Sequence, residues 1–299
     1  MKTIHFNDDY VLLTSAFNEE KYITKTLESV IHQTILPQRW VIVSDGSTDR
    51  TDDIVKDYVA RYGFIHFMRK DKKEDRNFWS KEFALSEGFQ LLANVDYSFY
   101  CTLDADVSFD ETYFQAILNK FHENPNLGIA GGIRLNYYND KLHKEISGIS
   151  NVVGSVQFFR KECFESIGGF FLSQNSGSVG DAVLEKKAKK NGWTVQSFPE
   201  LQIYHYRETG TRSSSTLKAR FKDGFYDYQL GNMIIFEFFK SCYRLLKERP
   251  YIIGAVFRLW GYLFACFKKP EKLLSKDEIV FAKKEQLVKI KMALIKFKL

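Results

Sequence analysis

The chain of 299 residues lacks the cysteine spacing of zinc-binding and disulfide-bonded proteins. Its four cysteines are scattered without a CxxC pair, so they indicate neither a zinc site nor a disulfide framework and fit a reducing compartment. Residues 1–9 lack the apolar run of a signal peptide, so we do not expect secretion. No recognised nucleic-acid-binding module accompanies the lysines, so we expect no nucleic-acid partner.

Negative charge is scarce in the last fifth of the chain. Residues 240–299 hold 15 Lys and Arg against 5 Asp and Glu, a charge of +10, and the net charge of the whole chain is +6. The preceding residues therefore carry about −4 (6 − 10), and the basic surface lies at the C-terminal end. The candidate partners of this basic surface are anionic lipid, nucleic acid or solvent alone.

Two successive strand–turn–helix units open the chain. An apolar strand at residues 10–13 is followed by residues with helical spacing from position 21, and a strand at residues 40–43 is followed by a helix that ends at Gly63. A third strand at residues 64–70, a helix at residues 81–92 and a fourth strand at residues 97–106 continue the pattern. Such repetition predicts a parallel sheet with right-handed crossovers.

Three polar turns follow three of these strands. They contain Ser15 to Glu20, Asp45 to Asp49, and the pair Asp104 and Asp106 in "LDAD". In an open parallel sheet the ligand lies beyond the carboxyl ends of the strands, so the three turns are expected to meet at one crevice. Paired acids at such an edge indicate a divalent cation with a phosphorylated ligand.

Four motifs in order resemble the family-2 glycosyltransferases, which have the glycosyltransferase-A fold. They are "TSAFNEE" (14–20), "DGSTD" (45–49), "LDAD" (103–106) and "VGDAVLEKKAKKNGW" (179–193). The resemblance covers residues 10–210 and implies an α/β catalytic domain over 1–210, with a mostly parallel nucleotide-binding sheet and helices on both faces. Residues 1–110 would bind the nucleotide-sugar and residues 111–210 the acceptor.

The resemblance also implies roles for residues of the first two turns. Asp45 would accept a hydrogen bond from the base of a nucleotide-diphosphate sugar, and Ser15 and Glu19 would line the pocket for that base. Phe17 would pack against the base, although an aromatic at this place also fits a core position.

For the diphosphate, the resemblance implies that Asp104 lies near the ribose and that Asp106 coordinates Mg²⁺ or Mn²⁺. Such a cation neutralises the charge that grows on the leaving diphosphate. His205 would complete the metal shell, but it also fits a packed position at a strand end. Lys81 would lie near the phosphates or else be a solvated lysine.

The resemblance also implies that Asp181 is the catalytic base, because the family places a carboxylate at the start of this helix. Inverting transfer needs such a group to take the proton from the attacking acceptor hydroxyl. The position also fits a helix N-cap, and the two roles are compatible. Three departures from the family put the acceptor contacts in doubt: Gly180 replaces the usual acidic neighbour, Val183 a second acid, and Lys187 the common arginine.

The C-terminal region, 211–299, is predicted to be helical and membrane-associated. An apolar block at residues 251–267 is just short of a membrane span, which indicates an interfacial position, and two soluble helices packed on the catalytic domain are the alternative. The tail carries Leu287, Ile290, Leu294 and Phe297 on one face with lysines around them, which is typical of a helix on anionic lipid. Arg207, Arg212 and Ser213 to Ser215 form a predicted mobile loop over the diphosphate, with an ordinary polar linker as the alternative, before the helical part of this region begins.

The leading hypothesis is a cytoplasmic glycosyltransferase, peripheral on the inner face of the cell membrane, with a glycan or lipid-linked acceptor. A haloacid-dehalogenase-like phosphatase would also use "LDADV", with Asp104 as nucleophile. However, such proteins begin with that strand, and here two units precede it. A nucleotide-sugar-binding protein without catalysis remains a third hypothesis.

Overall fold

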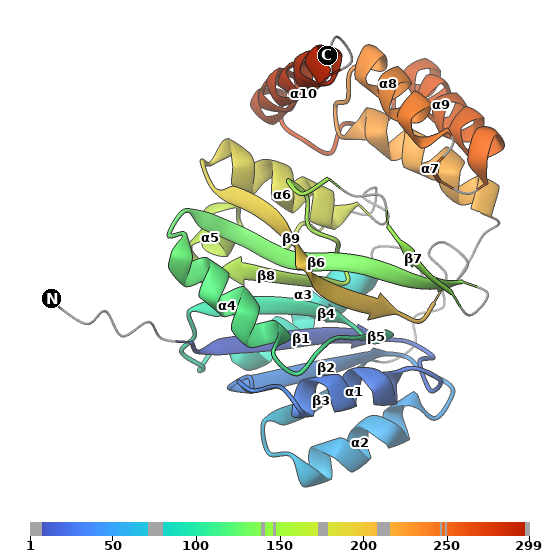
Figure 1. Cartoon of the computed structure of the whole chain (residues 1–299). Coiled ribbons are helices and arrows are strands. Elements are labelled where there is room, and N and C mark those ends of the chain that lie inside the picture. The colour runs from blue at the N-terminus through green and yellow to red at the C-terminus, as the bar shows by residue number, and fades with distance from the viewer. Residues whose placement is uncertain are drawn as a thin grey trace, which may run out of the picture. The chain divides into compact units, whose positions relative to one another are not determined.

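The structure, a computed structural model, describes residues 8–70, 80–138, 141–145, 148–172, 179–207, 216–245, 247–248 and 250–296. Arg212, Ser213 to Ser215 and Phe297 of the predicted features lie outside these ranges. The chain forms two compact units, an N-terminal unit (residues 1–174 and 180–208) and a C-terminal unit (residues 175–179 and 209–299). Each unit is described separately below (Figure 1).

Strands and helices alternate in the N-terminal unit, and the C-terminal unit is helical. The strands are β1 (Tyr10–Ala16), β2 (Arg39–Asp45), β3 (Ile65–Lys70), β4 (Phe99–Asp104), β5 (Val107–Ser108), β6 (Leu127–Tyr138), β7 (Lys141–Lys144), β8 (Val156–Arg160) and β9 (Thr194–His205). The helices are α1 (Ile23–Ile31), α2 (Thr51–Arg61), α3 (Ser80–Phe89), α4 (Tyr113–Glu123), α5 (Lys161–Ser166), α6 (Gly180–Lys190), α7 (Thr216–Gln229), α8 (Ile234–Arg244), α9 (Tyr251–Lys268) and α10 (Lys276–Lys296).

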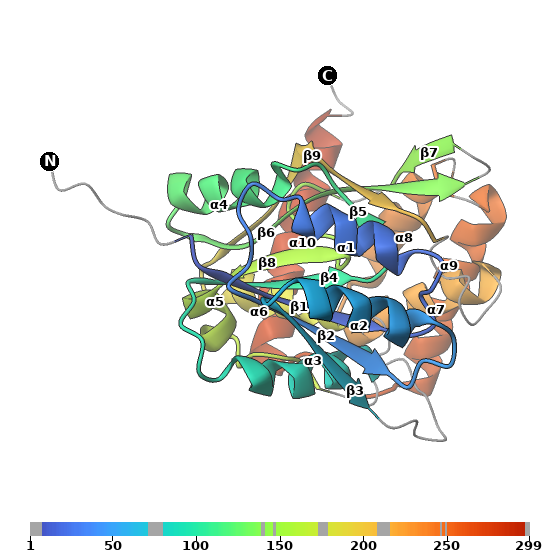
Figure 2. The same cartoon turned by 90° about the horizontal axis from the view of Figure 1, so that it is seen from below.

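One mixed sheet runs through the N-terminal unit. Its strands lie in the order β3-β2-β1-β4-β8-β6-β9-β5, with β7 paired to β6, and the order can be followed in Figures 1 and 2. The first four strands are mutually parallel, whereas β8 is antiparallel to both β4 and β6. The half expected to bind the nucleotide is therefore the parallel part of the sheet, as predicted.

Alternating side chains place a hydrophobic core on each face of the sheet. On β1, Tyr10 and Leu12 join the core under α1, α2 and α4, and Val11 and Leu13 join the core under α3, α5 and α6. All four side chains are fully buried, because a strand that is covered on both faces has no solvent side. The prediction of helices on both faces is confirmed.

Helices α7 and α9 cross closely in the C-terminal unit, at two glycines. A Cβ at Gly224 would lie 1.8 Å from the carbonyl oxygen of Arg258, and one at Gly261 would lie 1.9 Å from that of Phe221. Only glycine lets the two backbones approach this closely. Helix α9, which contains the apolar block, therefore packs along one side against α7.

A charged network lies inside the C-terminal unit. Arg258 is 5% exposed, and its guanidinium nitrogens lie 2.7 Å from Asp223, 3.0 Å from Asp227 and 3.5 Å from Glu248. Lys240 also binds Asp227, at 2.7 Å. The arginine that interrupts the apolar block thus has carboxylate partners within its own unit.

Helices α8 and α9 expose apolar side chains, and α10 exposes apolar side chains together with lysines such as Lys283 and Lys284. The exposed side chains include Ile234, Ile235, Phe238 and Phe239 on α8, Ile252, Ile253, Val256, Trp260, Leu263 and Phe267 on α9, and Val280, Leu287, Val288, Met292 and Ile295 on α10. A charged interior under an apolar exterior reverses the usual arrangement of a soluble helical domain. Of the predicted tail face, Leu287 is exposed and Ile290 is half-buried, while the Leu294 side chain lies outside the described part.

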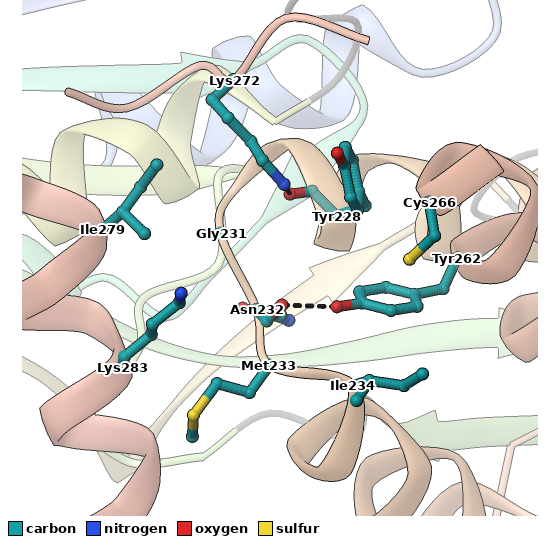
Figure 3. A pocket seen from close by; sticks show the side chains of 10 residues that line it. All are labelled: Tyr228, Gly231, Asn232, Met233, Ile234, Tyr262, Cys266, Lys272, Ile279 and Lys283. Carbon is teal, nitrogen blue, oxygen red and sulfur yellow. Dashed lines mark hydrogen bonds between the residues drawn. The ribbon is translucent and has the colours of Figure 1, made fainter. Parts of the chain in front are cut away.

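A pocket lies between α10 and the segment that joins α7 to α8 (Figure 3). The Tyr262 hydroxyl donates to the Asn232 carbonyl at 2.6 Å, and the Lys272 ammonium donates to the Tyr228 carbonyl at 2.6 Å. Burial lowers the pKa of Lys272 to about 8. Lys283 lines the same pocket, so two lysines stand among its apolar side chains.

Candidate active site

The carboxyl ends of β1, β2 and β4 bring three of the predicted residues to one edge of the sheet. Ser15 on β1 is aligned with Asp104 on β4 on one side and with Val43 on β2 on the other. Asp45 is the last residue of β2, two positions beyond Val43. Phe17, which follows β1, is half-buried and lies outside the two main cores. The first two predicted turns and the Asp-x-Asp turn thus share one edge.

Direct hydrogen bonds join the "FNEE" and "DGSTD" turns. The Asn18 carboxamide oxygen accepts from the Thr48 amide at 2.8 Å, and the Thr51 hydroxyl accepts from the Glu19 amide at 2.7 Å. Asn18 has φ +52° and Gly46 has φ +74°, a left-handed conformation that Asn and Gly adopt most readily. The residue types of the two motifs therefore fix the shape of the edge.

Asp106 and His205, the predicted metal ligands, meet at the start of β5 and the end of β9. His205 Nε2 lies 3.5 Å from Asp106 Oδ1, and both residues are buried. Burial lowers the pKa of His205, although Asp106 opposes this, so the imidazole tends toward its neutral form. Arg207 Nε lies 3.4 Å from Asp106 Oδ2, and the same guanidinium binds the buried Glu19 carboxylate.

The donor set around Asp106 fits a divalent cation that completes its shell with phosphate oxygens. His205 Nδ1 is buried without a hydrogen-bond partner in the described part of the chain. Over those residues, no group of three or more His, Cys, Asp or Glu side chains is arranged to hold a metal ion. Mg²⁺ commonly takes one or two carboxylates and completes its shell with water and substrate phosphates, so the Asp106 carboxylate suits Mg²⁺ or Mn²⁺, whereas the imidazole of His205 suits Mn²⁺.

Lys81 is tied to the first acid of the Asp-x-Asp pair. Its ammonium lies 2.6 Å from Asp104 Oδ1, so it is not the solvated lysine of the alternative interpretation. Burial alone would lower the pKa of Lys81, but Asp104 and Asp181 together raise it above its ordinary value. Burial raises the pKa of Asp104, and the Lys81 ion pair outweighs burial and holds it below its ordinary value.

Asp181 lines the same pocket as Lys81, beside the strand end that carries Asp104. Burial raises the pKa of the Asp181 carboxyl, the Lys81 ammonium opposes that rise, and the Asp104 carboxylate adds to it. A Cβ at Gly154 would lie 1.7 Å from Asp181 Oδ2, so the carboxylate rests on the bare backbone of this glycine. Asp181 is the second residue of α6, whereas the N-cap is the residue before the helix begins. The predicted N-cap role of Asp181 is therefore wrong by two positions.

Glu185 holds the loop that contains Gly154 against α6. Its carboxylate accepts from the Val152 amide at 2.7 Å and from the Asn151 carboxamide at 2.8 Å. Burial raises the pKa of Glu185 to about 7. Because both of its oxygens accept hydrogen bonds from the loop, Glu185 stabilises the structure beside Asp181.

Two charged residues near the site escaped the sequence analysis, and a third, Arg207, was predicted only as part of a loop over the diphosphate. Arg134, on β6, lies close enough to influence the pKa of Asp104 and of Asp181. Glu82 lines the pocket next to Lys81. The only feature of the sequence that could have identified Glu82 was its position next to Lys81. Nothing in the sequence near Arg134 indicated that it lies at the site.

The comparison with protein families identifies the chain directly. The model described as Glycosyl transferase family 2 matches residues 12–180, which is more than half of the chain. Poly-beta-1,6-N-acetyl-D-glucosamine synthase of Staphylococcus epidermidis is 28% identical over 145 residues, covering 48% of this chain and 31% of the synthase. An uncharacterised protein of Methanocaldococcus jannaschii is 28% identical over 65% of this chain and 88% of its own length. The chain thus spans about a third of the synthase it matches.

Solved structures share the fold at low sequence identity. S. aureus TarS 1–349 in complex with UDP-GlcNAc superimposes with a TM-score of 0.55 at 15% identity, covering 87% of this chain and 73% of TarS 1–349. The mannosyltransferase PcManGT from Pyrobaculum calidifontis, in complex with GDP-Man and Mn²⁺, gives 0.54 at 15% identity, covering 86% and 73%. The predicted glycosyltransferase-A fold is confirmed. With three motifs at one sheet edge, the fourth on α6 and the family match over residues 12–180, the chain belongs to glycosyl transferase family 2.

Proposed function

We propose that the protein is an inverting glycosyltransferase that moves a sugar from a nucleotide-diphosphate sugar to an acceptor hydroxyl. The observation that carries this proposal is the Lys81 ammonium, which binds Asp104 at 2.6 Å and lines the same pocket as Asp181. A carboxylate at the expected position of the base thereby lies beside the strand end expected to hold the donor. A binding protein without catalysis has no need of this juxtaposition.

The donor would lie across the ends of β1, β2 and β4. Asp45 accepts a hydrogen bond from the base, Phe17 packs against it, and Ser15 and Glu19 line its pocket. The hydrogen bonds between the first two turns keep this surface preformed, which lowers the entropic cost of binding. Asp104 binds near the ribose, with Lys81 placed to contact a phosphate.

Asp106 and His205 would hold Mg²⁺ or Mn²⁺. Bound there, the cation would neutralise the charge that develops on the leaving nucleoside diphosphate. Carboxylate oxygen suits either ion and neutral imidazole nitrogen suits Mn²⁺, and the buried His205 Nδ1 has no partner among the described residues. Arg207 would add a second positive charge on the same side.

Asp181 would act as the base. Its carboxylate takes the proton of the acceptor hydroxyl as the oxygen attacks the anomeric carbon, and the bond to the diphosphate breaks on the opposite face. Burial raises the pKa of Asp181 and so brings its basicity closer to that of a base working near neutral pH. The Gly154 backbone fixes the direction of the carboxylate.

The relatives support a role in polysaccharide or lipid-linked glycan synthesis. One is named as a synthase of poly-beta-1,6-N-acetyl-D-glucosamine, and TarS was solved with UDP-GlcNAc. We therefore place UDP-linked N-acetylhexosamines first among donors, with a glycan or lipid-linked acceptor. The division into a catalytic domain over 1–210 and a membrane-associated region over 211–299 is part of the same proposal.

The C-terminal unit would attach the protein to the inner face of the cell membrane. In the described part of the chain, α9 is the one helix long and apolar enough to cross a bilayer, and about a third of its residues are buried. Because α9 packs on α7 and carries the buried Arg258, we favour an interfacial position with its apolar face in the lipid. Lysines of the same unit would meet anionic headgroups.

Asp181→Asn tests the proposal. A base acts only as the new bond forms, so this variant should bind nucleotide-sugar with near-normal affinity and lose ~10²-fold or more in transfer or in slow donor hydrolysis. Donor affinity is measured by calorimetry with a panel of nucleotide-diphosphate sugars, and turnover by release of nucleoside diphosphate. Near wild-type turnover in the variant would remove Asp181 from the mechanism. A wild type that binds a donor but never turns it over would favour the binding-protein hypothesis.

A further inference from the structure

A second carboxyl group, that of Glu82, lies against the first residue of α6. Glu82 Oε1 is 3.0 Å from the place where a Cβ would stand on Gly180, and its Cγ is 3.3 Å from that place. Glu82 lines the pocket together with Asp181, although the two residues come from different helices. The missing side chain at Gly180 therefore provides the space that the Glu82 carboxyl fills.

The fold itself makes little use of this carboxyl group. Glu82 Oε2 is buried and accepts no hydrogen bond from any described residue. The nearest cation, Lys81, is already bound to Asp104. A buried carboxyl without a partner costs stability, and such groups persist mainly where a ligand uses them.

The pKa of Glu82 reflects the same surroundings. Burial and the neighbouring Asp181 and Asp104 carboxylates raise this pKa. The Lys81 ammonium and the backbone amide of Glu82 lower it, and the resulting pKa is about 7. The group therefore changes charge close to the pH at which the proposed base works. A carboxyl near its pKa can accept a hydrogen bond or donate one.

We infer that Glu82 is a substrate-binding residue, the second carboxyl beside the base, and that it hydrogen-bonds a hydroxyl of the acceptor sugar. This inference rests on the proposed function. The family resemblance leads us to expect an acidic residue at position 180, next to Asp181, and the chain has glycine there. Helix α3 thus places the Glu82 carboxyl beside Asp181, where position 180 of this chain has no acidic side chain.

The lining of this narrow pocket combines polar atoms with aromatic rings. Three further polar atoms in its lining are buried without a described partner: the Tyr100 hydroxyl, the Thr102 hydroxyl and the Gln157 carboxamide oxygen. Phe170 and Phe171 add aromatic surface, on which the C–H face of a sugar ring packs well. Glu82 Oε2 is therefore one of several buried polar atoms of this pocket that have no partner among the described residues.

Steady-state kinetics of Glu82→Gln test the inference. The probes are a nucleotide-diphosphate sugar that the wild type turns over and, as acceptor, a concentration series of p-nitrophenyl glycosides. We expect the acceptor kcat/KM to fall at least ~10-fold, mainly through KM, because a hydrogen bond to a charged group is lost. Glu87→Gln is the matched control, since Glu87 lies on the same helix, is half-buried and pairs with Lys70 at 2.9 Å. An unchanged acceptor KM in Glu82→Gln would overturn the inference.

A swap variant separates substrate binding from packing. In Glu82→Ala with Gly180→Glu, the carboxyl is returned to α6 in the space that Glu82 vacates, so acceptor kcat/KM should recover relative to Glu82→Ala alone. No recovery in a correctly folded swap variant would show that the position of this carboxyl is not what matters.

Melting temperature gives a readout that does not depend on turnover. The pKa of Glu82 in the fold, about 7, is above its ordinary 4.5, so the folded state holds this proton more tightly and wild-type stability falls as pH rises from about 4.5 through about 7. Glu82→Gln removes that loss, so at pH 8 it should melt at least about 2 °C higher than the wild type, with little difference at pH 4.5. A lower melting temperature at pH 8 would show that Glu82 is structural and would overturn the inference.

Discussion

The Asp181 carboxylate lies so close to Gly154 that a methyl group on this glycine would stand 1.7 Å from Asp181 Oδ2. Asp181 comes from α6, and Gly154 lies in the loop before β8. Glu185 ties the two together through the amide of Val152. The direction of the proposed base is therefore set by a residue with no functional group of its own.

Gly154→Ala should turn the Asp181 carboxylate away from its place. A displacement of about 1 Å at a reacting group can cost ~10²-fold, so we expect turnover to fall ~10- to 10²-fold while donor affinity changes little. Turnover and calorimetric titration of the donor measure the two effects. Gly148→Ala is the control, because a methyl group there meets nothing closer than 3.9 Å. Equal losses in both variants would mean that Gly154 does not act through Asp181.

Asp106→Asn tests the metal site. The substitution removes the negative charge opposite His205, so nucleoside-diphosphate binding should lose its dependence on Mn²⁺ or Mg²⁺ and transfer should fall at least ~10²-fold. Binding is titrated with and without Mn²⁺ or Mg²⁺. Metal dependence that survives in Asp106→Asn would rule out this ligand assignment.

Asp104→Asn provides the contrast to Asp106→Asn. Asp104 is bound to Lys81, so its substitution should weaken donor binding more than it changes metal preference. If both variants lose metal dependence equally, the two acids share the cation.

Arg258→Met should destabilise the C-terminal unit strongly. It leaves Asp223 and Asp227 without their buried guanidinium partner, and breaking a buried ion pair from one side typically costs about 3–5 kcal/mol. Denaturant unfolding followed by circular dichroism measures the loss. Lys268→Met, at an exposed position on the same helix, should change stability by less than about 0.5 kcal/mol. A loss this small in Arg258→Met would mean that the network contributes little.

Val256→Glu tests the proposed membrane surface. Val256 is 58% exposed on the apolar face of α9, so a charge there should leave the fold intact and reduce sedimentation with phosphatidylglycerol vesicles at least ~10-fold. High salt should weaken wild-type binding as well, because it screens the lysines. Ile149→Glu, at an exposed apolar position of the N-terminal unit, is the control. Equal wild-type binding to neutral and anionic vesicles would argue against the anionic surface.

The sequence by itself determined the sheet edge. Apolar strands followed by "FNEE", "DGSTD" and "LDAD" are local patterns, and local patterns decide where a strand ends and which side chains its turn presents. Ser15, Asp45 and Asp104 were therefore predicted to share an edge before any fold was known, and they do. The resemblance of "VGDAVLEKKAKKNGW" to the family also brought Asp181 into the prediction, with an error only in its place relative to the helix start.

Only the tertiary structure decided which distant side chains meet. Arg207 binds Glu19 across 188 positions of the chain, and Glu82 fills the space beside Gly180 because α3 and α6 pack on the same face of the sheet. Arg258, which looked like an interruption in an apolar block, is enclosed by carboxylates of α7 and of the segment before α9. Such pairings depend on how helices pack over the sheet and on each other, and a linear pattern of residues carries no direct record of that packing.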